Sequence, residues 1–308
     1  MSTPPVDSVL LIGFGGPTRA DEIMPFLRNV VRGRNIPNER LAEVAHHYEA
    51  LGGRSPYNDL AFEQARALEA ALAAAGAPLS VCVGMRNWHP FLAETLAEMA
   101  ARGLRRAVGV ILAAHRSPTS DQRYQLDVTR AREEVGDAAP EVEYVRPWFD
   151  DPLFVEANAA RLREALPGRD PWPADVPVVF TAHSIPVSMA QGSTYEADLT
   201  ATCAAVAEAL SLPRWELAYQ SRSGDPRTPW LAPDIAETLR RLAADGGREV
   251  VVQPIGFLSD HAEVLWDLDH EAAQVARDLS MTFHRAGTVN SHPAFIRLLA
   301  ERVREHLA

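Results

Sequence analysis

The sequence contains no lysine, so all 30 residues counted as Lys+Arg are arginine. A chain without lysine has neither the phosphate-binding lysine of a Walker A loop nor a lysine that forms Schiff bases or acts as a general base. The absence therefore excludes P-loop ATP chemistry and lysine-based covalent catalysis.

Cysteine is almost absent as well, with Cys82 and Cys203 the only two in the chain. They lie far apart and form no C-x-x-C pair, so one chain can assemble neither a thiolate zinc site nor a four-cysteine iron–sulfur cluster. This sparse use of cysteine favours a reducing compartment, and we expect a cytoplasmic location.

Positive charge is in deficit, because 30 basic residues face 41 acidic ones and the net charge is −11. A nucleic-acid partner is not expected, since binding phosphates requires a basic face. Long apolar runs are missing too: the run at 9–14 is short, ends in glycines and has no basic residues before it. We expect a first strand there rather than a signal peptide, and no transmembrane segment.

What the chain does have is enough length and apolar content for about two domains of roughly 150 residues, with 308 residues of which 47% are hydrophobic. Short apolar runs alternate with longer helical patterns, which is typical of an α/β fold with parallel sheets. The expected strands are 9–14, 80–85, 107–113, 141–145, 178–181, 216–220 and 249–255. The expected helices include 61–75, 91–101, 154–165, 195–210, 235–244 and 293–307.

Two strand ends resemble each other, because 107–113 continues into Ala-His-x-x-Pro at 114–118 and 178–181 continues into the same pattern at 182–186. This echo suggests a duplicated α/β domain. We place a first domain at 1–117, completed by the C-terminal helix within 286–308, and a second at 118–285. Ligands of open α/β sheets bind at the carboxyl ends of strands, so we expect a site in a cleft between the domains.

The glycine-rich turn at 13–17 follows the first expected strand. The third glycine of a dinucleotide-binding pattern would fall at Thr18, so the turn is interpreted as a loop that lets a ligand approach the backbone.

His183, at the end of another strand, has two interpretations. It is either a structural strand-end histidine or an imidazole that serves as a metal ligand or base.

The densest cluster of ionisable residues is the run 259–271, in which Glu263, Asp267 and Glu271 are spaced four residues apart. In a helix they would lie along one face and repel one another by a few tenths of a kcal/mol per pair, on the order of 0.2–0.5. A solvated acidic face is one interpretation. The apolar residues around the carboxylates favour another, a partly buried row of oxygens that conducts a divalent cation to an imidazole.

These motifs together resemble the ferrochelatase family, and they follow the family's order along nearly the whole chain. They are GGP at 15–17, YEALGG at 48–53 with Ser-Pro at 55–56, TAHSIP at 181–186, YQSR at 219–222 with PWL at 229–231, and PIGFLSDHAEVL at 254–265. The resemblance implies a chelatase fold of two similar Rossmann-like domains with a porphyrin cleft between them. It also implies insertion of Fe²⁺, as a substrate, into a porphyrin in haem biosynthesis without ATP, which would make the protein a lyase.

The resemblance assigns roles to individual residues. His183 and Glu263 match the catalytic pair of the family, which binds the metal and accepts protons, and which of the two does which is left open. Asp267 and Glu271 match a relay for metal or protons. A further four match porphyrin contacts, namely Phe14, Tyr48, Ser55 and Tyr124.

The short segment from Arg32 to Tyr48 resembles the Gram-positive type, which metallates coproporphyrin III, with protoporphyrin IX as the alternative substrate. Phe14 stands where well-known members have a tyrosine that ligates product iron, and Val31 and His47 stand where arginines can occur. Relatives with a two-iron cluster have a cysteine near Ser120, so no iron–sulfur cluster is expected.

We expect a monomer whose product passes to a downstream haem-pathway enzyme. Two other activities remain open: cobalt or nickel chelation by a sirohydrochlorin-type enzyme, and non-catalytic haem transport.

Overall fold

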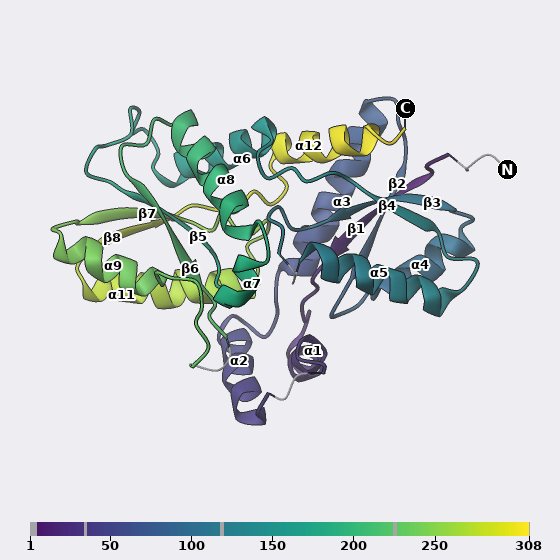
Figure 1. Ribbon diagram of the computed structural model, residues 1–308, viewed down its shortest axis with the longest axis horizontal. Coiled ribbons are helices and arrows are strands. Elements are labelled where there is room, and N and C mark those ends of the chain that lie inside the picture. Colours follow the sequence, from purple (N-terminus) through teal and green to yellow (C-terminus); the bar gives the residue numbers. More distant parts are fainter. Residues whose placement is uncertain (1–4, 34–35, 118–119, 224–226, 308) are drawn as a thin grey trace. The chain divides into compact units, whose positions relative to one another are not determined.

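A computed structural model describes residues 5–33, 36–117, 120–223 and 227–307, and the chain forms two compact units (Figure 1). Unit 1 comprises Met1–Leu112, Asp121–Arg146 and Ile296–Ala308. Unit 2 comprises Ala113–Ser120 and Pro147–Phe295. Among the described residues, no helix is both long and apolar enough to cross a bilayer.

Each unit is built on a four-stranded sheet, and every neighbouring pair of strands in both sheets is parallel. Sheet A, in unit 1, has the order β2-β1-β3-β4, and sheet B, in unit 2, has the order β6-β5-β7-β8. The strands are β1 Ser8–Gly13, β2 Ser80–Met85, β3 Arg106–Ile111, β4 Glu141–Tyr144, β5 Val178–His183, β6 Trp215–Gln220, β7 Glu249–Gln253 and β8 Thr282–Arg285. The expected fold class of two parallel α/β sheets is confirmed. Strand β8 was missed because it is a four-residue edge strand that carries His284 and Arg285, so no apolar run marks it.

The division into units differs from the expected domains at three places: Asp121–Arg146 belongs to unit 1 instead of the second domain, and 113–117 and 286–295 belong to unit 2 instead of the first. Asp121–Arg146 belongs to unit 1 because β4 extends sheet A, with Val142 opposite Ala107 of β3. Residue 118, where we expected the second domain to begin, lies outside the described residues.

The helices of unit 1 are η1 Ala20–Glu22, α1 Ile23–Val30, α2 Asn38–Ala50, α3 Tyr57–Ala74, α4 Leu92–Ala101 and α5 Asp121–Val135. Those of unit 2 are α6 Pro152–Ala165, α7 Val187–Gln191, α8 Tyr195–Ala209, α9 Ile235–Ala244, α10 Ala262–Val264, the π-helix η2 Leu265–Ala272 and α11 Ala273–Asp278. The final helix, α12, spans Pro293–Arg304. Two starts follow local capping chemistry, because Asp151 accepts from the Leu153 backbone and Asp234 from that of Ala236.

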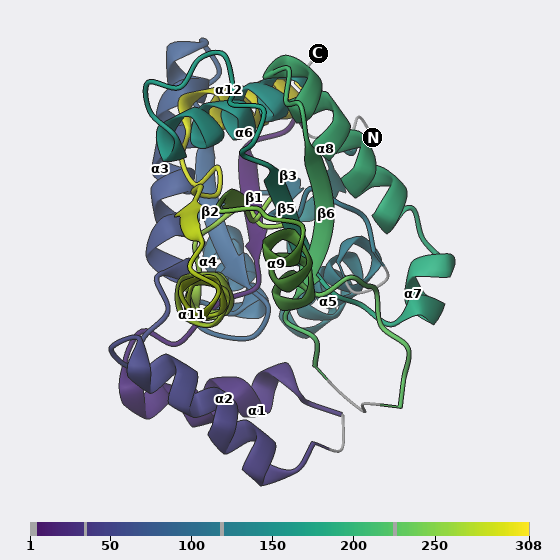
Figure 2. The same ribbon diagram turned by 90° about the vertical axis from the view of Figure 1, so that its left-hand side faces the viewer.

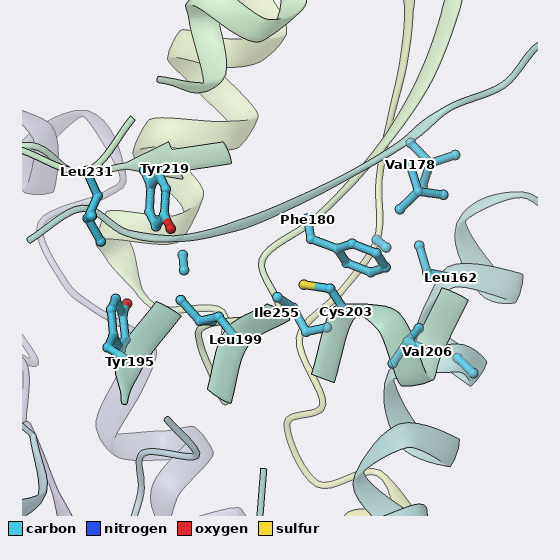
Figure 3. Close-up of a cluster of buried hydrophobic side chains, with 14 of the residues drawn as sticks. Leu162, Val178, Phe180, Tyr195, Leu199, Cys203, Val206, Tyr219, Leu231 and Ile255 are labelled. Carbon is cyan, nitrogen blue, oxygen red and sulfur yellow. The ribbon is translucent and has the colours of Figure 1, made fainter. Parts of the chain in front are cut away.

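Sheet B is covered on both faces, and its strands alternate between two cores. Phe180 of β5 packs with α6 and α8 in one core, whereas its neighbour Val179 packs with α9 and the segment from α10 to α11 in the other. Figure 1 shows these helices on opposite sides of the sheet, and Figure 3 shows Cys203 of α8 beside Phe180. Burial on both faces leaves the carboxyl ends of the strands as the place for polar groups.

In unit 1, α1 and α2 run side by side and form a small core of their own (Figure 2). Phe26 lies at its centre, and the rings of Phe14, Tyr48 and Trp88 meet it edge-on at centroid distances of 6.2, 5.9 and 6.3 Å. The aromatic packing joins the loop after β1 to these two helices.

Candidate functional site

His183 is the last residue of β5, the strand next to β6 and β7 in sheet B. Its Nδ1 hydrogen-bonds the backbone carbonyl of Ser184, and the Tyr195 hydroxyl donates to the carbonyl of His183 itself at 3.0 Å. A carbonyl oxygen can only accept, so Nδ1 carries the proton of the neutral ring. The lone pair of the neutral imidazole is therefore on Nε2, where it can bind a metal ion or take up a proton.

Glu263 faces that lone pair. Its Oε1 lies 3.7 Å from Nε2 of His183, and the two side chains are 42% and 35% exposed. Glu263 belongs to α10, which follows β7, so neighbouring strands position the two groups. A carboxylate and an imidazole lone pair repel each other unless a proton or a cation lies between them. The pair thus offers one nitrogen and one oxygen donor to a divalent cation.

The acidic run is not the regular α-helix expected from its spacing. Between α10 and α11, residues Leu265–Ala272 form a π-helix, whose hydrogen bonds close over five residues instead of four. Such wide turns are rare and occur often at functional sites. Asp267 nonetheless lies near both other carboxylates, since the charges of Glu263 and Glu271 both raise its pKa.

Asp267 has an unusually high pKa, about 7, because burial and then the charge of Glu263 disfavour its ionised form. The charge of Glu271 acts in the same direction. Hydrogen bonds donated by the Ser221 hydroxyl and, at 3.3 Å, by Nε2 of Gln220 hold the pKa from rising further. An acid with this pKa takes up and releases protons near neutral pH.

Gln220 and Ser221 hold Asp267 from the carboxyl end of β6, and sequence reasoning gave them no role. Gln220 is itself fixed by the Thr181 hydroxyl at 2.8 Å, and Ser221 has a left-handed backbone with φ of 61°. Left-handed φ is uncommon for residues other than glycine. The signal available in the sequence was the YQSR motif at the end of a strand.

Glu271 lies at the exposed end of the row of carboxylates. The indole N–H of Trp266 donates to its Oε1 at 2.9 Å, and the Trp266 ring stacks on His270 at 5.0 Å. Glu271, Asp267 and Glu263 therefore lead from an exposed position to His183. Within the described ranges, no three His, Cys, Asp or Glu side chains come together as a preformed metal centre.

His261 is a second histidine beside the pair, and sequence reasoning did not single it out. It precedes α10, and its Nδ1 accepts a hydrogen bond from the Val264 backbone at 3.4 Å. Burial lowers the pKa of His261, while the charges of Glu263 and Asp260 raise it. The ring is thereby held neutral as an N-cap of the helix that carries Glu263.

The expected porphyrin contacts all belong to unit 1, whereas His183 and Glu263 belong to unit 2. Phe14 and Tyr48 are partly buried against Phe26, as described above. Ser55 and Tyr124 are only 3% and 7% exposed. The structure therefore does not test these four as ligand contacts.

Tyr124 and Ser55 each have partners within unit 1. The guanidinium of Arg86 lies 5.4 Å from the centre of the Tyr124 ring and pairs with Asp127 at 2.6 Å. The Ser55 hydroxyl accepts from the Tyr57 backbone at 3.3 Å. These contacts anchor both side chains in the fold of the unit.

The apparent echo between the two strand ends does not reflect equivalent positions. By strand order, β3 corresponds to β7 and not to β5, so His115 and His183 follow non-equivalent strands. His115 is 4% exposed, its Nε2 lies 3.0 Å from the Thr202 hydroxyl, and burial lowers its pKa to about 4. The duplication is visible in the topology, whereas the shared Ala-His-x-x-Pro pattern is not evidence for it.

Comparison with known proteins gives full-length matches. The family model described as Ferrochelatase matches residues 6–307. A ferrochelatase of Rhodopirellula baltica is 43% identical over 305 residues, covering 99% of this chain and 87% of the relative. A coproporphyrin III ferrochelatase of Nocardia farcinica is 45% identical over 317 residues, covering 98% and 88%. Another, from Mycolicibacterium smegmatis, is 42% identical over 309 residues, covering 98% and 90%.

Solved structures share the fold at much lower identity. SirB from Bacillus subtilis, solved with Fe³⁺, matches with a TM-score of 0.60 at 15% identity, covering 98% of this chain and 96% of that one. A cobalt complex of the sirohydrochlorin chelatase SirB from Bacillus subtilis subspecies spizizenii matches with a TM-score of 0.58 at 12% identity, covering 98% and 95%. At such identities the likeness concerns the fold alone.

Proposed function

Because the chain belongs to the ferrochelatase family, lyases that insert iron into a porphyrin, we propose that it metallates coproporphyrin III and that His183 and Glu263 form its metal-binding pair. Ferrous iron is a substrate in this reaction. The observation that carries the assignment is the 3.7 Å approach of Glu263 Oε1 to Nε2 of His183, the ring nitrogen that does not face the Ser184 carbonyl.

The chemistry of insertion fits this pair. A free-base porphyrin must lose two pyrrole N–H protons when Fe²⁺ takes their place, so the site needs donors that bind the cation and a group that accepts protons. His183 supplies a neutral nitrogen, which suits ferrous iron, and Glu263 supplies a negatively charged oxygen. Two protein ligands are few enough to be exchanged for the four porphyrin nitrogens.

Asp267 and Glu271 serve as the relay in this proposal. The proposal is supported by the pKa of Asp267, about 7, which lets it carry a proton in either direction near neutral pH. It is also supported by the exposed position of Glu271, where protons reach solvent or cations enter. Which of the two cargoes travels along the row is left open.

Coproporphyrin III is proposed as the substrate from the names of close relatives and from the short segment between Arg32 and Tyr48. The test is a comparison of kcat/KM for coproporphyrin III and protoporphyrin IX with anaerobic Fe²⁺. We expect coproporphyrin III to have the higher value by at least about tenfold, which corresponds to about 1.4 kcal/mol. A clear preference for protoporphyrin IX would refute the substrate assignment.

The same assay separates catalysis from haem transport. An enzyme forms many equivalents of metalloporphyrin per chain, whereas a carrier stops at one. Phe14, Tyr48, Ser55 and Tyr124 remain proposed porphyrin contacts. A monomeric state, a cytoplasmic location, an iron–sulfur-free and ATP-independent reaction and a downstream haem-pathway partner remain predictions.

A further inference from the structure

One arginine holds the segment that carries the acidic row at two points. Arg285 is the last residue of β8, and its Nη1 hydrogen-bonds the carboxylate of Asp260, just before α10. Its Nε and Nη2 bind the two carboxylate oxygens of Asp269, within η2, at 2.8 and 3.2 Å. The side chains of Arg285, Asp260 and Asp269 are 19%, 17% and 33% exposed. A bidentate pair with little exposure is among the stronger ionic contacts.

Asp260 is itself held firmly by the loop after β8. Its carboxylate accepts from the Thr288 backbone at 3.3 Å and from Nδ2 of Asn290 at 2.8 Å. The backbone N–H of Asp260 donates to Oδ1 of Asn290 at 3.1 Å. Arg285 therefore connects η2 to a fixed point of the fold.

Residues at both edges of sheet B hydrogen-bond η2. Asp267 is held by Gln220 and Ser221 at the end of β6, and Asp269 is held by Arg285 at the end of β8. In the order β6-β5-β7-β8 these are the two edge strands. Two contacts from opposite edges, two residues apart on one helix, fix its rotation about its own axis.

That rotation matters because the segment is a π-helix. Wide turns are less favourable than α-helical ones and persist where the surroundings hold them. If the segment returned to α-helical turns, the rotation about the helix axis between α10 and Asp269 would change. The directions of the Glu263 and Asp267 side chains relative to each other would then change as well. Arg285 opposes this change through a contact that touches neither residue.

We propose that Arg285 is a positioning residue for metal insertion: by binding Asp260 and Asp269 it fixes the rotation of η2 and so directs Glu263 and Asp267 toward His183. The inference rests on the proposed function of the His183–Glu263 pair. It assigns Arg285 no contact with metal or porphyrin.

The test measures kcat and porphyrin KM for anaerobic Fe²⁺ insertion, with both coproporphyrin III and protoporphyrin IX, at a temperature where each full-length variant is folded. Arg285→Met should lower kcat about 10- to 100-fold, as misplacement of reacting groups by about 1 Å does, and leave KM unchanged. Arg285→Lys, which keeps the charge but not the bidentate fork, should recover part of kcat. Should Arg285→Met not fold, Asp269→Asn removes only the bidentate half of the contact.

The matched control is Arg169→Met, which removes another arginine–carboxylate pair of unit 2. Arg169 binds Glu249 at 2.9 Å at the opposite end of sheet B, where β7 begins. This variant should keep the wild-type kcat. If Arg285→Met loses thermal stability but keeps kcat in the same way, the positioning role is refuted.

A double-mutant cycle separates this inference from the function on which it rests. In single-turnover assays, Arg285→Met should lower the rate by a smaller factor in a Glu263→Gln background than in the wild type, because part of its effect passes through Glu263. An equal factor in both backgrounds would refute positioning. A wild-type kcat in Glu263→Gln alone would instead refute the proposed metal-binding pair.

Discussion

Sheets A and B have the same strand order and the same parallel directions, yet their corresponding central strands end in opposite ways. Strand β5 ends in His183, a partly exposed imidazole that faces Glu263. Strand β1 ends in Gly13, where an added Cβ would lie 2.7 Å from Sδ of Met85 and 3.1 Å from the Tyr57 hydroxyl. Sheet B presents an imidazole side chain at this point, whereas sheet A presents bare backbone packed against the side chains of Met85 and Tyr57.

The difference continues into the loops that follow. After β1, an added Cβ at Gly16 would lie 2.8 Å from Cβ of Ser55, so the chain passes close to its neighbours as bare backbone. After β5 and β7, side chains with ionisable groups converge. The shared topology thus provides two equivalent strand ends, and the size of the local residues decides which of them presents an ionisable side chain.

The largest expected effect is at the end of β5. His183→Ala should lower kcat/KM for iron insertion by about 10²- to 10⁴-fold, since in the proposed site His183 is both a metal donor and a proton acceptor. The fold should persist, because the side chain is 35% exposed. Steady-state kinetics and circular dichroism measure the two quantities.

His115→Gln is the matched control for that substitution. His115 is buried and bonds to Thr202, and it has no part in the proposed site. The variant should keep the wild-type kcat, with any loss confined to stability. Comparable losses of kcat in both variants, or near-normal turnover in His183→Ala, would refute the functional role proposed for His183 at the end of β5.

Asp267 gives the next largest effect, on stability. Its pKa is about 7 in the folded chain and about 3.9 when unfolded, so between these values the folded state binds a proton that the unfolded state has lost. Wild-type stability therefore falls as pH rises from about 4 to about 7. Asp267→Asn does not titrate and should raise the free energy of unfolding by about 1–3 kcal/mol at pH 8, after allowance for partial exposure.

Urea unfolding at pH 8 and near pH 4 measures this effect. The gain should disappear near pH 4, where the wild-type carboxyl is protonated in both states. A gain of the same size at both pH values would show that the strain at Asp267 is not ionic. Asp267→Asn should also lower kcat, because the amide cannot carry protons as the proposed relay requires.

The smallest effect is expected at the end of β1. Gly13→Ala should lower the free energy of unfolding by about 1–2 kcal/mol, because Met85 and Tyr57 must shift to admit the methyl group. Gly192→Ala is the control, since its Cβ would meet nothing nearer than 3.8 Å and should change stability by less than about 0.5 kcal/mol. Equal stability of both variants would mean that β1 can accept a side chain after all.

Local sequence patterns predicted β1 to β7 of the two sheets and most of the long helices. β-branched and apolar runs such as 249–255 bury residues on both faces of a sheet, and this requirement is visible without tertiary information. The motifs around His183 and Glu263 also pointed to the family, which the comparisons confirm. Their assignment as the metal-binding pair stays a prediction.

Tertiary contacts decided what periodicity does not encode. The spacing of Glu263, Asp267 and Glu271 fits an α-helix, but the chain forms a π-helix at that point, where Ser221 after β6 and Arg285 of β8 hydrogen-bond it. Edge strand β8 has no apolar signature, and the place of Asp121–Arg146 in unit 1 depends on a strand pairing.

By itself the sequence determined the chemistry this protein has available: no lysine, two separate cysteines, and an acidic run near a strand-end histidine. Only the tertiary structure decided which of these groups lie together. Three features depend on residues that are distant in the chain: the proximity of His183 to Glu263, the burial of Asp267 and the hydrogen bonds of Arg285 to Asp269. Long-range packing rather than local preference therefore sets the distances between these groups and the pKa of Asp267.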